Sequence, residues 1–210
     1  MTPSPQLQQQ ALAWDAHACF PLRPVPELAQ LKHYKESGFN FVSINVGMDI
    51  NPLADVAQII AGFRHYIRAH ADDYVLTECV TDIYAARAAH KLAVAFDLEG
   101  SEPLAGNVHM VEFFYDLGVR QMLLAYNQDN RAAGGCMEGD IGLTPYGRLL
   151  VQEMNRVGMV VDVTHMGHRA TLETFEIASA PVIFSHANPK GVRDHVRNIS
   201  DAQIKGCAQT

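Results

Sequence analysis

Short apolar runs rich in β-branched residues alternate with amphipathic segments of helical length from about residue 39 onward. This alternation is typical of βα units, in which helices cover a sheet of parallel strands. We therefore expect an α/β fold. The expected strands are 11–19, 39–47, 92–100, 119–126, 159–165 and 181–186, and the expected helices lie around 26–37, 53–71, 80–90, 107–117, 145–157 and 168–178.

Glycines mark the ends of several expected helices. Gly38, Gly118 and Gly158 stand where a left-handed C-terminal cap is favourable. The run 75–80 also resembles a strand, but Thr81 and Asp82 can cap the helix that follows it. We assign this run to the connection into the helix and leave it out of the strands.

The composition indicates one soluble domain over residues 1–210. The chain is 48% apolar and 19% charged, which is sufficient for one sizeable core. No apolar stretch approaches the roughly 18 residues of a membrane helix, and the first ten residues lack the features of a signal peptide. We expect a cytoplasmic protein without a membrane segment. The four cysteines form no CxxC pair and are expected to be thiols: Cys19, Cys79, Cys136 and Cys207.

The charge pattern argues against nucleic-acid binding. The formal net charge is −7, aromatic residues make up 8% of the chain, and lysine and arginine are spread thinly. Binding of nucleic acid needs a basic stripe or patch, which this sequence does not offer.

Side chains that can bind metal stand at the ends of four of the six expected strands. They are His17 with Cys19, Glu99, His165 and His186. The carboxyl ends of parallel strands are where both open α/β sheets and β/α barrels gather their chemistry. We therefore expect these side chains to converge.

Each residue also has a plainer interpretation. His17 and Cys19 share a strand face with Asp15, but such a pair is weak evidence, because a buried cysteine is usually a small hydrophobe. Glu99 ends an apolar strand, where a cation, a metal or a solvated mouth could each stabilise its charge. These three explanations remain open.

The histidines together favour metal. His165 and His186 end successive strands, and with His17 and Glu99 they make a set of N and O donors that zinc prefers. Five others lie in expected helices and receive no role: His33, His65, His70, His90 and His109. His168 and His195 are left undecided.

Five segments occur in the order of the motifs of the membrane (renal) dipeptidases. They are DAHACFPL, AVAFDLEGSEPL, GVRQMLLAYNQDN, GLTPYGRLLVQEMNRVGMVVDVTHMG and PVIFSHANPKGVRDHVRNISD. The chain resembles this metallopeptidase family from about residue 12 to its end. The fourth segment is long and specific, and the Asp-x-x-His pattern is followed 21 residues later by Phe-Ser-His, which is the spacing of the family.

The resemblance implies two zinc ions at the mouth of a TIM-like (β/α)8 barrel. His17 and Cys19 correspond to ligands of one zinc, Glu99 to the bridging carboxylate, and His165 and His186 to ligands of the second. A hydroxide shared by the two ions would attack the peptide bond of a dipeptide, with Glu99 in the catalytic centre. Dipeptides are the implied substrates.

Arg197 matches the arginine that pairs with the terminal carboxylate of the substrate. A guanidinium fork suits a carboxylate, although without the resemblance a surface arginine is the simpler interpretation.

Three departures from the family pattern qualify these expectations. Cys19 stands where many members have Asp, and a thiolate is a softer ligand that oxidises. Tyr126 stands where well-known members have His; its hydroxyl can still bind substrate by donating to an oxyanion, and functional and structural interpretations are balanced. About six of eight strands are recognisable in 210 residues, whereas such a barrel typically needs roughly 250, so we expect a chain truncated at its C-terminus.

Two alternatives to a zinc dipeptidase stay open. One is an inactive fragment or pseudoenzyme of the same family, and the other is a metal-dependent amidohydrolase that acts on a non-peptide amide or lactam. A homodimer is also left open.

Overall fold

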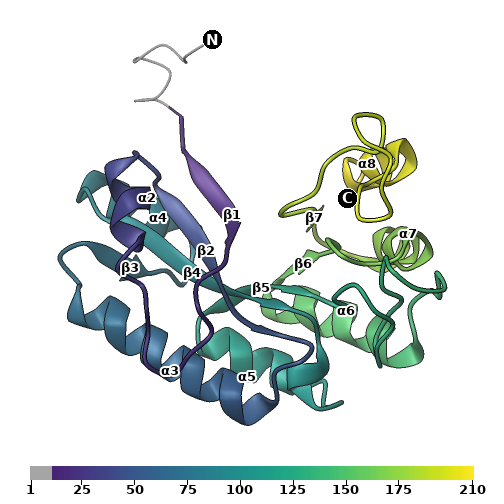
Figure 1. Ribbon diagram of the computed structural model, residues 1–210, viewed down its shortest axis with the longest axis horizontal. Helices are drawn as coiled ribbons and strands as arrows, with labels where there is room; N and C mark the ends of the chain where they lie inside the picture. The colour runs from purple at the N-terminus through teal and green to yellow at the C-terminus, as the bar shows by residue number, and fades with distance from the viewer. Residues whose placement is uncertain (1–10) are drawn as a thin grey trace.

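The computed structural model describes residues 11–210. Seven parallel strands form one sheet with the order β1-β2-β4-β5-β6-β7, and β3 pairs with β4 outside that path. Figure 1 shows the sheet curled, with helices along its outer side and with β1 and β7 at its two edges. The strands are β1 (Trp14–Ala18), β2 (Phe41–Met48), β3 (Tyr74–Leu76), β4 (Leu92–Glu99), β5 (Val119–Leu123), β6 (Val160–Asp162) and β7 (Val182–Ile183). The expected α/β class and incomplete barrel are confirmed.

The expected helices are present with shorter ends. They are α2 (Leu31–Glu36), α3 (Leu53–Ala69), α4 (Val80–Ala88), α5 (Met110–Asp116), α6 (Pro145–Val157) and α7 (His168–Ile177). A 3-10 turn, η1 (Glu102–Leu104), and α8 (Asp201–Cys207) were not expected. The three glycines named above follow α2, α5 and α6 and have positive φ angles, which agrees with their predicted capping role.

The omission of the run 75–80 from the strands was wrong. Tyr74–Leu76 forms β3, which pairs in parallel with the first three residues of β4. The next helix is capped by Cys79, and the carboxylate of Asp82 accepts a hydrogen bond from the Cys79 backbone N–H at 3.0 Å. A three-residue strand gives too short a periodic signal to separate from the connection that follows it.

The central strand β4 is buried along its whole length. Phe96 and Leu98 belong to the apolar core, whereas the alternate residues Asp97 and Glu99 belong to a set of buried polar side chains. Since successive side chains of a strand point to opposite faces, β4 has an apolar outer face and a polar inner face. The inner face therefore ends in two carboxylates.

No helix within residues 11–210 is long and apolar enough to cross a membrane.

Candidate metal centre

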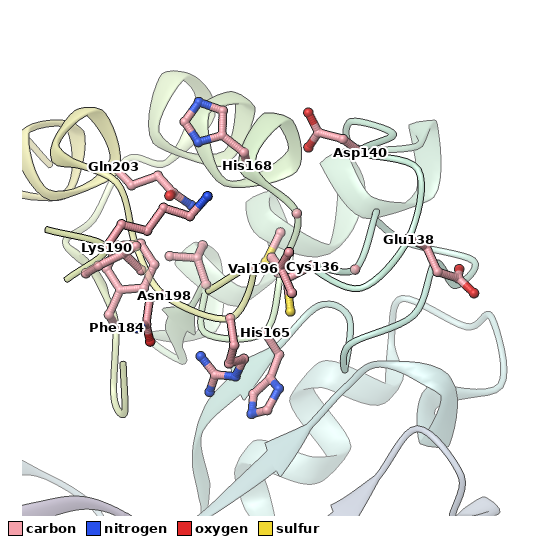
Figure 2. A pocket seen from close by; sticks show the side chains of 16 residues that line it. Cys136, Glu138, Asp140, His165, His168, Phe184, Lys190, Val196, Asn198 and Gln203 are labelled. Carbon is pink, nitrogen blue, oxygen red and sulfur yellow. The ribbon is translucent and has the colours of Figure 1, made fainter. Parts of the chain in front are cut away.

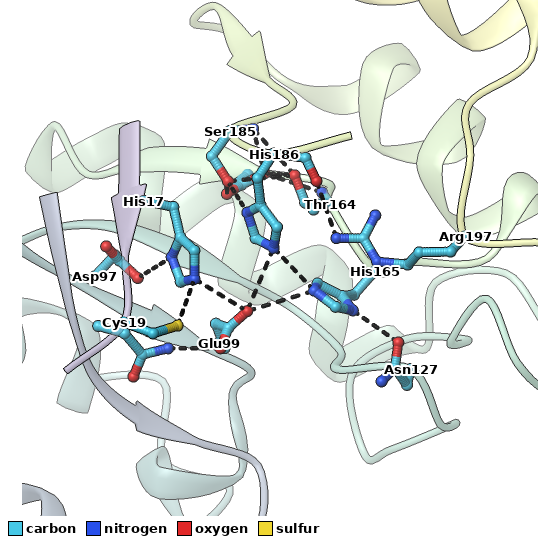
Figure 3. Close-up of polar contacts among 12 residues, drawn as sticks. His17, Cys19, Asp97, Glu99, Asn127, Thr164, His165, Ser185, His186 and Arg197 are labelled. Atoms are coloured by element: carbon cyan, nitrogen blue, oxygen red, sulfur yellow. Dashed lines mark hydrogen bonds and ion pairs between the residues drawn. The ribbon is translucent and has the colours of Figure 1, made fainter. Parts of the chain in front are cut away.

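The carboxylate of Glu99 is the centre of the site. It is 2% exposed, and its Oε1 atom faces the Nε2 atoms of His17 at 3.5 Å, His165 at 3.4 Å and His186 at 3.5 Å (Figure 3). The side-chain amide of Asn45 donates a hydrogen bond to the other oxygen, Oε2, at 2.7 Å. The expected convergence of strand-end residues is present in the structure.

The charge of Glu99 is stabilised by its neighbours. Burial raises the pKa of a carboxyl group, but the close contacts with His165 and His186 and the charge of His17 outweigh it and lower the pKa of Glu99 to about 2. Glu99 is therefore an anion at neutral pH in a place with little access to water.

His17 is held by a second carboxylate. Its Nδ1 atom donates to Asp97 Oδ1 at 2.9 Å, and the hydroxyl of Ser43 donates to Asp97 Oδ2 at 2.6 Å. Burial lowers the pKa of His17, but the hydrogen bonds with Asp97 and Cys19 and the charges of Asp97 and Glu99 raise it to about 11. The two buried carboxylates thus attract positive charge to this position.

The ring of His165 is oriented by an amide. Its Nδ1 atom donates to Asn127 Oδ1 at 2.7 Å, which directs Nε2 towards Glu99. Both residues have left-handed backbones, with φ of +67° for His165 and +62° for Asn127. β6 ends at Asp162, so the expected strand 159–165 is shorter than predicted, and His165 lies in the turn that follows it.

The ring of His186 is oriented by a hydroxyl. Ser185 donates its only proton to Asp162, so Ser185 Oγ accepts from His186 Nδ1 at 2.7 Å. The Nε2 atom of His186 is then free to face Glu99. Strand β7 ends at Ile183, before this serine, which is earlier than expected for the run 181–186.

These three histidines fit a metal site. Each uses Nδ1 in a hydrogen bond and directs Nε2 towards one carboxylate oxygen, which is how proteins hold metal-ligating imidazoles. The Nε2 atoms of His165 and His186 lie 2.9 Å apart, so two nitrogen lone pairs face each other unless a proton or a cation lies between them. The donor atoms of His17, Glu99 and His186 all lie within 4.8 Å of one another. Imidazole and carboxylate donors in this number suit a transition-metal ion such as zinc.

Cys19 lies beside this group. It is exposed just after β1, and its Sγ atom lies 3.2 Å from His17 Nε2. The pairing of β1 with β2 shifts register between Asp15 and Ala18, so the expected shared face of Asp15, His17 and Cys19 is interrupted. Asp15 instead accepts a hydrogen bond from the backbone N–H of His17 at 3.1 Å.

Tyr126 and Arg197 adjoin the histidines. The Tyr126 ring lies 4.4 Å from the ring of His165, between centroids, and burial together with the charge of Glu99 raises its pKa. The guanidinium of Arg197 donates to the backbone carbonyl of His186 at 3.0 Å. Figure 2 shows a hollow beside His165, and Arg197, Cys136 and Lys190 also line it.

The other histidines lie outside the group around Glu99. The five that received no role are exposed. His168 begins α7 and lines the hollow of Figure 2, and His195 accepts a hydrogen bond from the backbone N–H of Arg197 at 3.1 Å.

Sequence reasoning missed the residues that orient the histidines. Asp97 and Asp162 each interrupt an apolar strand, and such a buried carboxylate needs a partner. That signal is present in AFDLEG and VVDVTH and could have indicated both. Nothing in the sequence singles out Asn127 or Ser185, because their role depends on contacts between distant segments.

Residues 37–210 match the family model described as membrane dipeptidase (peptidase family M19). An uncharacterized dipeptidase of Schizosaccharomyces pombe is 43% identical over 107 residues, which are 50% of this chain and 26% of that protein. Dipeptidase 3 of Rattus norvegicus is 33% identical over 142 residues, which are 64% of this chain and 29% of that protein. The chain thus spans about a quarter to a third of the length of the curated relatives it matches.

Solved structures share the fold. An amidohydrolase from Pseudomonas aeruginosa has a TM-score of 0.90 and 27% identity, and the match covers 97% of this chain and 61% of that one. A metallo peptidase from Rhodobacter sphaeroides, liganded with a phosphinate mimic of the dipeptide L-Ala-D-Ala, has a TM-score of 0.84 and 18% identity, with 94% and 71% covered.

Proposed function

The chain belongs to the membrane dipeptidase family, and on that premise we propose that the group around Glu99 binds two zinc ions and hydrolyses the peptide bond of dipeptides. The observation that carries this proposal is the approach of three imidazole Nε2 atoms to one oxygen of a buried carboxylate. That arrangement costs free energy in the absence of a cation and supplies ligands in its presence.

The ligands divide into two sets that share Glu99. His17 and Cys19 would hold one ion, since Cys19 Sγ lies 3.2 Å from His17 Nε2. His165 and His186 would hold the other, since their Nε2 atoms lie 2.9 Å apart. The Oε1 atom of Glu99 faces the Nε2 atoms of both sets, so this carboxylate suits a bridging role.

Bound zinc supplies an acidified water and a Lewis acid for the peptide carbonyl. The residues of the chain supply orientation. Asp97, Asn127 and Ser185 fix the three imidazoles through their Nδ1 atoms, so the Nε2 atoms are in place before a ligand arrives.

Arg197 and Tyr126 supply substrate contacts in this proposal. The guanidinium of Arg197 lies beside the histidines and can pair with the terminal carboxylate of a dipeptide. The hydroxyl of Tyr126 stays protonated at neutral pH, because its pKa is raised, and it can donate to the oxygen on which charge develops. A clamp on the carboxylate near the reacting bond favours short substrates.

The test is metal content measured together with hydrolysis. We expect two zinc ions per chain, and cleavage of unblocked dipeptides that a chelator abolishes and zinc restores. Glu99→Gln should nearly abolish turnover, and Glu176→Gln, an exposed control on α7, should leave it unchanged. Less than one zinc per chain without dipeptide cleavage would instead support the inactive-fragment alternative.

A substrate panel separates the remaining alternative. The solved structure of an amidohydrolase from Pseudomonas aeruginosa is similar over 97% of this chain, which keeps non-peptide amides in consideration. Hydrolysis of a lactam with none of any dipeptide would overturn the proposed substrate class.

A further inference from the structure

A second hollow lies at the other end of the strands from Glu99. It has a volume of about 360 Å³ and is walled by the C-terminal half of α3, by β3, and by the segments that lead into β4 and β5. Binding pockets for small molecules typically measure about 300 to 1,000 Å³. Because it opens at the amino ends of the strands, this hollow is separate from the candidate metal centre.

Four cationic side chains line this hollow: Arg64, Arg68, Lys91 and Arg120. They are a quarter of the 16 lysines and arginines in a chain whose formal net charge is −7. Within residues 11–210 none of the four forms an ion pair, although Glu78 and Asp116 also line the hollow. None of the four is thus paired directly, although the charges of Glu78, Asp73 and Asp82 act on Arg64, Lys91 and Arg120 respectively.

Neutral carbonyl groups hold three of these cations in place. Arg64 donates to the backbone carbonyl of Leu117, and Lys91 donates to that of Ala71 at 2.7 Å. Arg120 donates through Nε to the carbonyl of Glu78 at 3.1 Å. Arg120 also donates through Nη1 to the carbonyls of Tyr115 and Val119, so these contacts fix its side chain and leave its Nη2 group for a ligand. Arg64 contacts Leu117 through Nη1 alone and keeps its other donors.

The fourth cation, Arg68, differs from the other three because no carbonyl group of the described chain holds it. Arg68 is exposed and makes no hydrogen bond or ion pair within the part of the chain that the structure describes. Burial, followed by the charges of Arg68 and Arg120, lowers the pKa of Arg64 although Glu78 raises it, so these like charges lie near one another. Such a cluster repels itself unless an anion occupies it.

We propose that this hollow binds a doubly charged tetrahedral oxyanion, namely phosphate or a phosphomonoester. Among the side chains that line the hollow, four cations outnumber two carboxylates, and this excess of positive charge suits a phosphate anion. Guanidinium groups recognise phosphate oxygens in a bidentate manner, and an ammonium group adds a point charge.

Calorimetric titration of the metal-free chain with inorganic phosphate tests this proposal. The metal is removed so that phosphate cannot bind to it, and chloride keeps the ionic strength constant. We expect saturable binding of one phosphate and a rise in melting temperature with its concentration. Arg68→Gln should weaken binding about ten-fold, because a charge-assisted hydrogen bond is lost without disturbing a contact in the protein.

The control is Arg23→Gln, which removes the same charge from an exposed site outside the hollow and should leave phosphate affinity unchanged. Phenyl phosphate in a parallel titration distinguishes the two sources: equal affinity assigns the site to phosphomonoesters, and binding of phosphate alone assigns it to the free anion. An absence of saturable phosphate binding, or an unchanged affinity in Arg68→Gln, would overturn the proposal.

Discussion

His17 Nδ1 lies 2.9 Å from Asp97 Oδ1, and this contact decides which ring nitrogen of His17 faces Glu99. Asp97 and Glu99 are two residues apart on β4, so both carboxylates reach the inner face of the sheet. One orients the imidazole, and the other meets its Nε2 atom at 3.5 Å. Because alternate side chains of β4 share a face, this one strand supplies both the proposed ligand Glu99 and the carboxylate of Asp97 that orients His17.

Asp97→Asn should weaken zinc binding by roughly 10- to 100-fold, because the orienting carboxylate also raises the basicity of His17. Competition with a chromophoric chelator measures the affinity, and circular dichroism checks the fold. Asp72→Asn, an exposed change of the same kind, is the control. Unchanged zinc affinity in Asp97→Asn would show that the His17–Asp97 contact is only structural.

Zinc should protect Cys19 from alkylation. The Cys19 thiol is exposed, and a metal-bound thiolate reacts more slowly than a free one. We expect labelling by iodoacetamide to slow by about ten-fold or more when zinc is added. Cys79 is also exposed and serves as the internal reference. Equal labelling of Cys19 with and without zinc would remove it from the ligand set.

Arg197→Ala should raise KM about ten-fold or more for dipeptides with a free carboxylate and have little effect on amidated ones, because the proposed contact is with that carboxylate. Steady-state kinetics on matched pairs of substrates measure both. The neighbouring Arg193 is exposed, and Arg193→Ala is the control. If both substrate classes lost activity equally, the clamp assignment would be wrong.

Glu173 should stabilise the fold above about pH 4.5 and lose this effect in acid. Burial raises its pKa, but the Leu143 backbone N–H, Arg169 and Arg148 lower it below the ordinary value of 4.5. A carboxyl group with a depressed folded pKa contributes stability above its unfolded pKa, and this stability is lost as the pH falls through the folded pKa.

Urea unfolding of Glu173→Gln at pH 7 and at pH 3 measures this effect. At pH 7 we expect a loss of about 1 to 3 kcal/mol, and at pH 3 a smaller difference from the parent chain. Glu176→Gln, on the exposed side of the same helix, should show no such pH dependence. A loss of equal size at both pH values would exclude a charge effect.

Much of the fold could be predicted from local pattern. The apolar runs locate six strands, and helical periodicity with glycine caps locates six helices, because burial of one face imposes those periods on the sequence. β3 was not predicted, because three residues are too few to show the alternating pattern of a strand. The ends of β6 and β7 could not be predicted from the sequence, because the turns after them depend on contacts between distant segments, such as that of His165 with Asn127.

The candidate site was also predictable only in part. Four of the expected metal residues, His17, Glu99, His165 and His186, come together, because parallel strands end at one edge. Their orienting partners are set by tertiary contacts. The placement of Cys19 also depended on an irregularity in the pairing of β1 with β2, which alternation along a strand does not foretell.

The rings of His17 and His186 stack with centroids 4.1 Å apart, although β1 and β7 are opposite edges of the open sheet. His17 lies near the beginning of the described residues and His186 towards their end, so their contact closes residues 17–186 into a loop. Closing a loop of this length costs conformational entropy. The two proposed ions, one bound by each ring and both by Glu99, would therefore hold the two edges of the sheet together, and their removal would free both edges to fray.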